Sequence, residues 1–496
     1  MELVKQSFLY KGVMKIYTIL NVWIKNSYIY KLIIGFVNII ENSIKKSFVF
    51  NKFTKEIDKE KQMDESIFVK LIYKLVSIYK KIFSFLKIDK LFKDSIFAKT
   101  YIWVGFTIAL APFLPTMIML AMVLACILSF ALKIGITENF KLKYTPVNFS
   151  VMLFFIVYMF SAITSINVMS SIKIALLVGS FILFYFVIVN SFENEKQVKT
   201  VVTIFIIAGV LVSIYGIYQY IFIANSTSSW VDSEMFEDLN TRVYSTFENP
   251  NVLGEYLLLV IPVAVSMFFA EKGIFKKAIA FIFVSIMMLC LALTFSRGCY
   301  LGILFAASVF VILLNFKFII LFFAGILALP FVLPKAILDR FTSIGDMKDS
   351  STSYRVNIWK ACIDMIEGCK LASLGQGKDV FNRIYPMFAY NESMAEHSHN
   401  LYLQIIIETG ICGILTFVFM IYRFYQYIFN GIKNTMNFSN KVYLIGFVSA
   451  MSGFLIQSIF DNSWYNYRVV LIFWAFIGLA VSYRKYMVNE VDTSND

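Results

Sequence analysis

The sequence contains few histidines and few charged residues, and its cysteines form no recognisable pattern. Only two of its 496 residues are histidine, and the charged residues make up 16%. The six cysteines are scattered and show no Cys-x-x-Cys spacing, while His397 and His399 are not spaced as zinc ligands usually are. We therefore expect no metal and no cofactor. The first 20 residues lack a small-residue cleavage site, so no removable signal peptide is expected.

Apolar residues are abundant instead. They make up 59% of the chain, and the mean hydropathy is +0.72, which exceeds what soluble domains carry. In lipid, every backbone polar group needs a partner within the protein, which leaves helices or closed barrels. The apolar runs are too long and too uniform for barrel strands. The sequence therefore predicts an all-α polytopic membrane protein.

About twelve transmembrane helices are expected between residues 101 and 483. Residues 101–132 contain Pro112 and Pro115, which predict a break into a short helical pair. The other spans are expected at 149–164, 171–189, 198–223, 252–270, 274–295, 300–314, 318–333, 401–422, 442–459 and 469–483. Polar segments at 224–249 and 334–398 interrupt them, the larger one lying before the last three spans.

Residues 1–95 differ from the rest of the chain. They hold 18 lysines against nine acidic residues, so most of the net charge of +13 lies there. Apolar residues recur between the lysines at helical spacing, and no charge-free stretch is long enough to cross a bilayer. We expect basic amphipathic helices on an anionic cytoplasmic membrane surface. A solvated helical domain or a partner-binding coil is the alternative.

The distribution of lysine predicts the orientation. If the N-terminus is cytoplasmic, the lysine-rich short loops also lie inside, as membrane proteins generally arrange them. The transmembrane domain is then 96–485, with a cytoplasmic tail at 486–496. Both long polar segments and both histidines fall outside. The short outer loops contain almost no lysine but do contain arginine, at Arg242, Arg297 and Arg468.

Both histidines lie at the start of the span 401–422. Asn400 can cap that helix, because its side-chain oxygen can accept a hydrogen bond from a free backbone N–H. The positive end of the helix dipole favours neutral imidazole, which can accept a proton. His399 is therefore a candidate general base, and His397 is a second candidate, since only one of two positions two apart on a helix faces a given side. A helix cap or an interfacial polar group is the alternative.

Three arginines and one glutamate complete the candidate site. The planar fork of arginine suits phosphate, so Arg242, Arg297 and Arg355 could together hold a diphosphate beside the membrane. Snorkelling or simple solvation are the alternatives. Around Arg355, the residues Tyr354, Ile358 and Trp359 predict an amphipathic face on the membrane surface. Glu408 lies inside an apolar span and is expected to orient a histidine or pair with an arginine.

These residues form an ordered set of short motifs over about residues 100–485. The motifs are Ser245-Thr246-Phe247-Glu248-Asn249-Pro250-Asn251, Leu293-Thr294-Phe295-Ser296-Arg297-Gly298, Arg355 with Trp359, Gly375-Gln376-Gly377, His397-Ser398-His399-Asn400-Leu401-Tyr402-Leu403-Gln404 and Glu408-Thr409-Gly410. In this order they resemble the O-antigen ligase and O-antigen polymerase family of bacterial membrane glycosyltransferases. Residues 1–95 are not part of that pattern.

The resemblance implies a reaction at the outer face of the cytoplasmic membrane. Members move a glycan from undecaprenyl diphosphate to a hydroxyl of a lipid A core sugar, of another lipid-linked glycan or of a protein, with inversion and without a metal. By the same resemblance, His399 is the family's histidine, and Arg297 and Arg355 bind the diphosphate. The partners expected are the lipid-linked donor, the acceptor and membrane lipids, with no nucleic acid.

A transporter or lipid-glycan flippase is the rival function. Transporters usually carry charged residues deep in several spans and often contain internal repeats. Here the spans are mostly uncharged in their middles, no repeat is visible, and polar groups gather at one face. The pattern therefore favours chemistry at the outer face over translocation.

Overall fold

The structure, a computed structural model, describes residues 67–92, 95–223, 242–332, 334–343, 350–369, 375–377, 380–390 and 393–488. The expectation for residues 1–66 and for most of the loop 224–249 lies outside these residues. The helices are α6 (Ile67–Phe85), α7 (Ile88–Phe92), α8 (Thr100–Leu110), α9 (Thr116–Ile136), α10 (Pro146–Ile163), α11 (Val168–Ser191), α12 (Glu195–Phe222), α13 (Pro250–Ala270), α14 (Ile274–Leu293), α15 (Arg297–Asn315), α16 (Ile319–Val332), α17 (Lys335–Thr342), α18 (Ser350–Gly368), α19 (Phe381–Ile384), α20 (Leu401–Asn434), α21 (Phe438–Gln457) and α22 (Tyr467–Met487), with short 3-10 turns η1 (Ile96–Ala98), η2 (Ala111–Phe113), η5 (Phe316–Phe318) and η6 (Tyr385–Met387).

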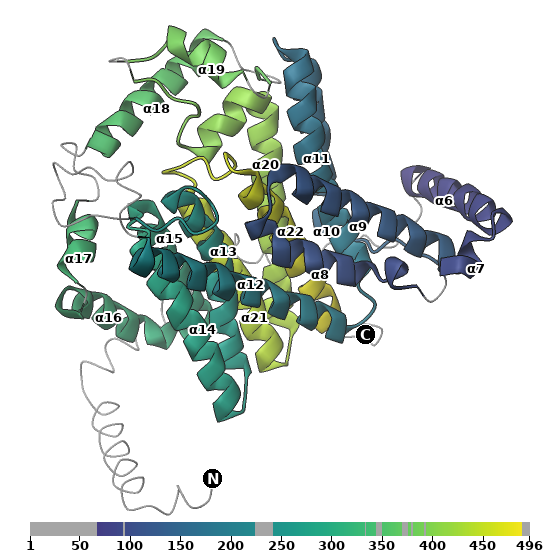
Figure 1. The fold of residues 1–496 in the computed structure, drawn as a ribbon, viewed down its shortest axis with the longest axis horizontal. Coiled ribbons are helices and arrows are strands. Elements are labelled where there is room, and N and C mark those ends of the chain that lie inside the picture. The colour runs from purple at the N-terminus through teal and green to yellow at the C-terminus, as the bar shows by residue number, and fades with distance from the viewer. Residues whose placement is uncertain are drawn as a thin grey trace, which may run out of the picture.

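The chain forms an all-α membrane bundle, as the sequence predicts (Figure 1). Among the described residues, ten helices are long and apolar enough to cross a bilayer, one of which runs through α15 into α16 as Arg297–Ala328. The predicted break at Pro112 and Pro115 is present, because η2 separates α8 from α9. The part of the predicted helical pair before the break, Thr100–Phe113, is an apolar helix that is shorter than the ten candidate spans. Twelve crossings therefore stay a prediction.

Helices α13, α21 and α22 form the centre of the bundle. Between 72% and 89% of their apolar windows is buried, against 22% for α14 and 6% for Arg297–Ala328. The glycines Gly302 and Gly453 allow α15 and α21 to touch along their backbones, because a Cβ at Gly453 would meet the carbonyl oxygen of Gly302 at 2.6 Å. The peripheral helices α14 to α16 leave their apolar surface available to lipid.

The two ends of the bundle differ in character. One end, which we call the histidine end, carries His397, His399 and the starts of α15, α20 and α22. The opposite end collects lysines, where Lys133 bonds to the carbonyl oxygen of Ser191 at 2.6 Å and Lys485 to that of Tyr144 at 2.9 Å. This separation is what the lysine distribution predicts, although the side of the membrane that each end faces stays a prediction.

Helix α20 is kinked at Gly410, whose φ of 69° and ψ of −170° are outside the helical range. The kink frees the carbonyls of Ile407 and Glu408, which accept hydrogen bonds from the backbone N–H groups of Gln376 and Gly377 at 2.8 and 2.9 Å. The Gly375-Gln376-Gly377 and Glu408-Thr409-Gly410 motifs are therefore two halves of one contact. It holds the segment after α18 against α20.

Within the segment from α17 to α19, helices α18 and α19 lie at the upper left of Figure 1 beside the upper end of α20, and α18 contacts α20. Helix α18 buries Ile358 and Met365 against α19, η6 and Ile407 of α20. Of the three residues of the amphipathic face predicted around Arg355, Ile358 packs into this small core, Trp359 bonds to His399 and Tyr354 is exposed. The position of this face on the membrane surface stays a prediction. A period of 3.6 residues reveals an apolar face but not which apolar partner covers it.

Helix α6 projects with α7 from the side of the bundle (Figure 1). It packs on α9 at the end opposite the histidines, where Lys80 donates hydrogen bonds to the carbonyls of Thr137 and Glu138 at 2.7 and 2.9 Å. Phe83 is buried there against Gly135. A second apolar stripe is exposed along the helix. It consists of Leu71, Leu75, Ile78, Ile82 and Phe85, and it is flanked by Lys70, Lys74 and Lys81.

Candidate active site

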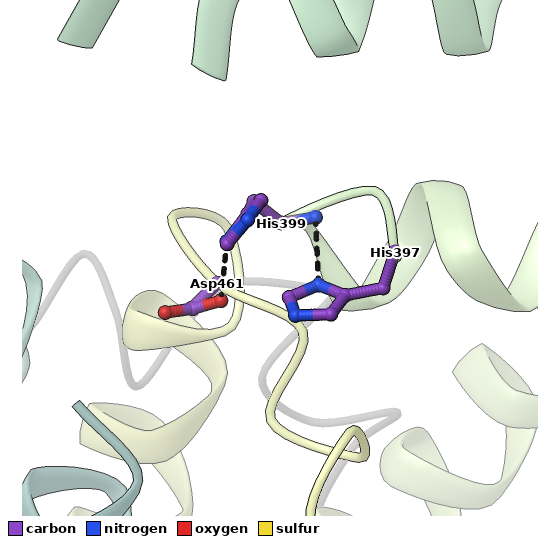
Figure 2. A group of neighbouring side chains, drawn as sticks. All are labelled: His397, His399 and Asp461. Carbon is purple, nitrogen blue, oxygen red and sulfur yellow. Dashed lines mark hydrogen bonds and ion pairs between the residues drawn. The ribbon is translucent and has the colours of Figure 1, made fainter. Parts of the chain in front are cut away.

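A histidine–aspartate pair forms the centre of the site. The Nδ1 of His399 lies 3.0 Å from Oδ1 of Asp461, which follows α21, and both side chains come from loops (Figure 2). With Nδ1–H donated to the carboxylate, Nε2 of His399 is left as a proton acceptor. Asp461 thereby fixes both the tautomer and the ring orientation, as the acid does in a catalytic triad.

The backbone around the pair is strained. His399 has a φ of 46°, and Ser245, Glu248 and Phe295 in the other motifs have φ of 50°, 64° and 49°. A left-handed conformation is uncommon for residues other than glycine and costs about 1–3 kcal/mol each. Asn400 holds the turn, because its side chain accepts a hydrogen bond from Leu403 N–H at 3.0 Å and caps α20 as predicted. Strain of this kind is typical of functional loops.

His397 lies beside His399 with its ring centroid 4.2 Å away, as Figure 2 shows. Its Nδ1 accepts a hydrogen bond from the backbone N–H of His399 at 3.3 Å, which leaves Nε2 as the protonated nitrogen of a neutral ring. Burial lowers the pKa of His397 to about 4, and the neighbouring His399 and Arg355 act in the same direction. His397 is thus neutral at physiological pH and presents a donor.

Arg355 and His399 are brought together by α18. The indole Nε1 of Trp359 donates to the carbonyl oxygen of His399 at 3.2 Å, one turn along α18 from Arg355. The guanidinium of Arg355 lies 3.7 Å from Oδ2 of Asp461. Burial alone would raise the pKa of Asp461, but the hydrogen bond from His399 and the charge of Arg355 hold it well below its usual range. Asp461 is therefore ionised at the pH of a living cell.

Arg242 is connected to the same carboxylate through Asn251. It donates to Asn251 Oδ1 and to the carbonyl of Thr294, both at 2.9 Å, and Asn251 donates in turn to Asp461 Oδ2 at 2.9 Å. Burial, followed by the charges of Arg340 and Arg355, lowers the pKa of Arg242 to about 9. Arg340 and Arg355 thus lie close enough to Arg242 for their charges to act on it, and guanidinium groups gathered in this way suit an anionic ligand.

Arg297 and Arg468 have other contacts. Arg297 is the first residue of α15, and its NH1 lies 3.3 Å from both the carbonyl and the Oγ of Ser343, three residues beyond Arg340. Ser343 Oγ in turn donates a hydrogen bond to the carbonyl oxygen of Arg340, so Arg297 is connected to Arg340 through the end of α17. Arg468 bonds to the carbonyls of Leu114 and Thr246 and ties α22 to η2, which is a structural role.

Glu408 reaches the histidine loop through an intermediate side chain. Its Oε1 accepts a hydrogen bond from Gln404 Nε2 at 2.7 Å, and Gln404 Oε1 accepts one from the backbone N–H of Ser398 at 2.9 Å. Ser398 lies between the two histidines, so Glu408 supports the loop that presents them. This arrangement fits a positioning residue better than a proton donor.

The same cluster offers metal-ligand atoms. His397, His399 and Asp461 each present one such atom within 4.8 Å of the others. Two of the three groups, however, are already joined by the His399–Asp461 hydrogen bond, and Arg355 brings a positive charge to the same carboxylate. A divalent cation at this position would have to break the His399–Asp461 hydrogen bond and would be repelled by Arg355. The donor set therefore fits a hydrogen-bonded pair better than a metal centre.

The sequence interpretation missed two groups in this site. Asp461 stands alone at the end of the span before α22, and an isolated acid at the same end as the histidines was the available signal. Arg340 is 95% buried on α17 and close enough to Arg242 to lower its pKa. No local pattern sets Arg340 apart, because only the packing of α17 brings it to the site.

A comparison with protein families places most of these residues in one domain. Residues 282–418 match the family model described as O-antigen ligase. The match runs from α14 into α20 and includes Arg297, Arg355 and both histidines, while Arg242 and Asp461 lie outside it. It confirms the family resemblance of the sequence motifs. No curated protein matches the chain.

Proposed function

Because residues 282–418 match the O-antigen ligase family model, we propose that this protein transfers a glycan from a polyprenyl diphosphate to a hydroxyl acceptor. We further propose that the reaction takes place at the histidine end of the bundle, facing away from the cytoplasm. The observation that carries the proposal is the ion pair of Arg355 with Asp461 of the His399–Asp461 pair, together with Arg242, which reaches the same carboxylate through Asn251.

The arginines stabilise the leaving group in this proposal. As the bond between the anomeric carbon and the phosphate oxygen breaks, the diphosphate departs with the electron pair and gains negative charge. Guanidinium forks held in place beside a low-dielectric membrane stabilise that charge without reorganising. Arg297, at the start of α15, adds a fourth positive charge beside the lipid-facing side of the bundle.

His399 acts on the acceptor. Nε2 takes the proton as the acceptor oxygen attacks the anomeric carbon from the face opposite the diphosphate, which inverts the configuration. Asp461 stabilises the imidazolium that results, because its carboxylate stays ionised. His397, with its pKa of about 4, is a poor base and offers its N–H instead. In this proposal the two histidines therefore have different roles, His399 as the base and His397 as a hydrogen-bond donor.

An apolar cavity on the lipid-facing side suits the polyprenyl chain of the donor. It has a volume of about 550 Å³ and lies between α13, α14, α15 and η5. Its wall on α15 comprises Ile303, Ala306, Ala307, Phe310, Val311 and Leu314, which form one face of the helix that begins at Arg297. A lipid whose head group met Arg297 could therefore lay its tail along the same helix.

In vitro transfer tests the proposed function. Purified protein in nanodiscs would be given undecaprenyl-diphosphate oligosaccharide and candidate acceptors, and products would be separated by mass. Formation of a glycosylated acceptor together with free undecaprenyl diphosphate supports the proposal. Movement of the intact lipid-linked glycan between leaflets without any product would instead favour a flippase.

We expect this transfer to persist in excess EDTA. The charge at the diphosphate is balanced by arginine side chains, and His399 already has a hydrogen-bond partner in Asp461. The rate would be measured in the nanodisc assay before and after chelation. Loss of activity that returned with a divalent cation would contradict this expectation and assign the His397, His399 and Asp461 cluster to a metal.

We also propose that α6 lies on the cytoplasmic membrane surface. Its exposed stripe, centred on Leu75, is bordered by Lys70, Lys74 and Lys81, which suits acyl chains below and anionic head groups beside them. The helix packs on the end of α9 that is opposite the histidine end. The basic extension would thus anchor the domain to anionic lipid.

A fluorescent probe at Leu75→Cys is expected to be quenched by spin-labelled lipid, whereas one at Ser84→Cys is not. Both residues are exposed on α6, but Ser84 lies on a different face from the apolar stripe. The probes would be compared in nanodiscs of phosphatidylglycerol, in a background without the six native cysteines. Equal quenching at both sites would contradict membrane contact by the stripe.

A further inference from the structure

A groove lies between α6 and the segment that follows α9, at the end of the bundle opposite the histidines. It has a volume of about 650 Å³, within the range of small-molecule binding sites. Residues of α6 between Tyr73 and Ser84 form one wall, and residues 138–141 form the other. None of these residues belongs to the candidate active site, so the groove is a separate feature of the molecule.

Hydrogen bonds hold the two walls of the groove in place. The Nζ of Lys80 donates to the carbonyl oxygens of Thr137 and Glu138 at 2.7 and 2.9 Å. Two turns earlier on α6, the hydroxyl of Tyr73 accepts a hydrogen bond from the backbone N–H of Leu142 at 3.3 Å. A groove whose walls are fixed in this way loses little conformational entropy when a ligand enters it.

The groove is positively charged. Its walls carry the ammonium groups of Lys80, Lys81 and Lys141 against one carboxylate, that of Glu138. Within the described part of the chain, Lys81 and Lys141 are exposed and have neither a hydrogen-bond nor an ion-pair partner. Ser77 adds a hydroxyl to the wall on α6. Ammonium and hydroxyl groups that line one groove are donors suited to the oxygens of a phosphate.

The position of the groove favours a lipid over a soluble phosphate. Ser77 and Lys81 line the groove, and the residues that follow them, Ile78 and Ile82, belong to the exposed apolar stripe of α6. A phosphate bound in the groove would therefore place its acyl chains beside that stripe. The lysine distribution predicts that this end of the bundle is cytoplasmic, and basic pockets on that side of a membrane suit anionic lipid head groups.

We propose that this groove binds the head group of one anionic phospholipid, with Lys81 and Lys141 donating to the phosphate oxygens. The inference goes beyond glycan transfer and rests on the proposed position of α6 at the cytoplasmic membrane surface. General attraction to an anionic surface needs no fixed site, whereas this lipid has one. It connects α6 to the segment after α9 and thereby holds the basic extension against the transmembrane domain.

Lipid binding by the full-length protein tests this proposal without any glycan transfer. The protein would be titrated in detergent with dioleoyl-phosphatidylglycerol, dioleoyl-phosphatidylcholine or glycerol phosphate, and native mass spectrometry would count the bound molecules. The phosphatidylglycerol is expected to bind about tenfold more tightly than the phosphatidylcholine, whose choline cation would meet the lysines. Equal affinity for the two lipids would overturn the proposal. Glycerol phosphate that bound as tightly as phosphatidylglycerol would overturn the choice of a lipid.

Four variants connect the binding to the groove. Lys81→Gln and Lys141→Gln are each expected to weaken the binding of phosphatidylglycerol about tenfold. Lys74→Gln, which removes the same charge from an exposed position on α6 outside the groove, is the matched control and should have little effect. Ser77→Trp, which fills the groove from an exposed position, should also weaken the lipid. Equal effects of the three lysine variants, or binding that is indifferent to Ser77→Trp, would overturn the site and leave only the general charge of the surface.

Discussion

Replacing His399 by asparagine is expected to lower the rate of glycan transfer by about 10²–10⁴-fold, the range that general-base catalysis supplies. Asparagine tolerates the left-handed backbone that His399 adopts, with φ 46°, and can still donate to Asp461, but it cannot accept the acceptor's proton. His399→Ala should lose as much activity. Transfer would be measured in the nanodisc assay, with expression and thermal stability recorded for each variant.

Asp461→Asn and His397→Asn separate the roles within the pair. Asp461→Asn should also reduce transfer, because the amide can no longer stabilise the imidazolium. His397→Asn keeps a neutral side chain with an N–H donor, so we expect a smaller loss than for His399→Asn. If His399→Asn retained full activity in a folded protein, or if His397→Asn alone abolished transfer, the assignment of the base would be wrong.

Replacing Arg355 by lysine is expected to reduce kcat/KM by about 10²-fold, although the positive charge is kept. In the transition state, negative charge develops on the oxygens of the departing diphosphate. The guanidinium can donate two parallel hydrogen bonds to two of these oxygens, whereas lysine offers only a point charge. The same variant should bind inorganic pyrophosphate less tightly. The measurement is the inhibition constant of pyrophosphate in the transfer assay, alongside the kinetic constants.

Arg383→Lys is the matched control for this experiment. Arg383 lies on α19, but its side chain is exposed, and it does not line the cavity beside His397. Its replacement should change neither kcat/KM nor the inhibition by pyrophosphate. Equal effects of Arg355→Lys and Arg383→Lys would mean that Arg355 acts only through the general charge of the surface.

The order of the motifs could be read from the sequence, but their pairing could not. Gly375-Gln376-Gly377 and Glu408-Thr409-Gly410 are each a weak signal, and their hydrogen bonds become visible only where α20 kinks at Gly410. Glycine content alone does not distinguish a kink from close helix packing. The same limit applied to α18, because the spacing of its apolar residues did not indicate that Ile358 packs against α19 and α20.

The sequence by itself determined the class of the protein, because the long apolar runs and the need to satisfy backbone hydrogen bonds in lipid leave little choice but a helical bundle. It also identified both histidines and most of the arginines of the candidate site. Only the tertiary structure selected Asp461 as the partner of His399 and brought Arg340 to Arg242. Residues 62 positions apart along the chain become neighbours through helix packing, and that packing depends on contacts among many side chains that no local spacing records.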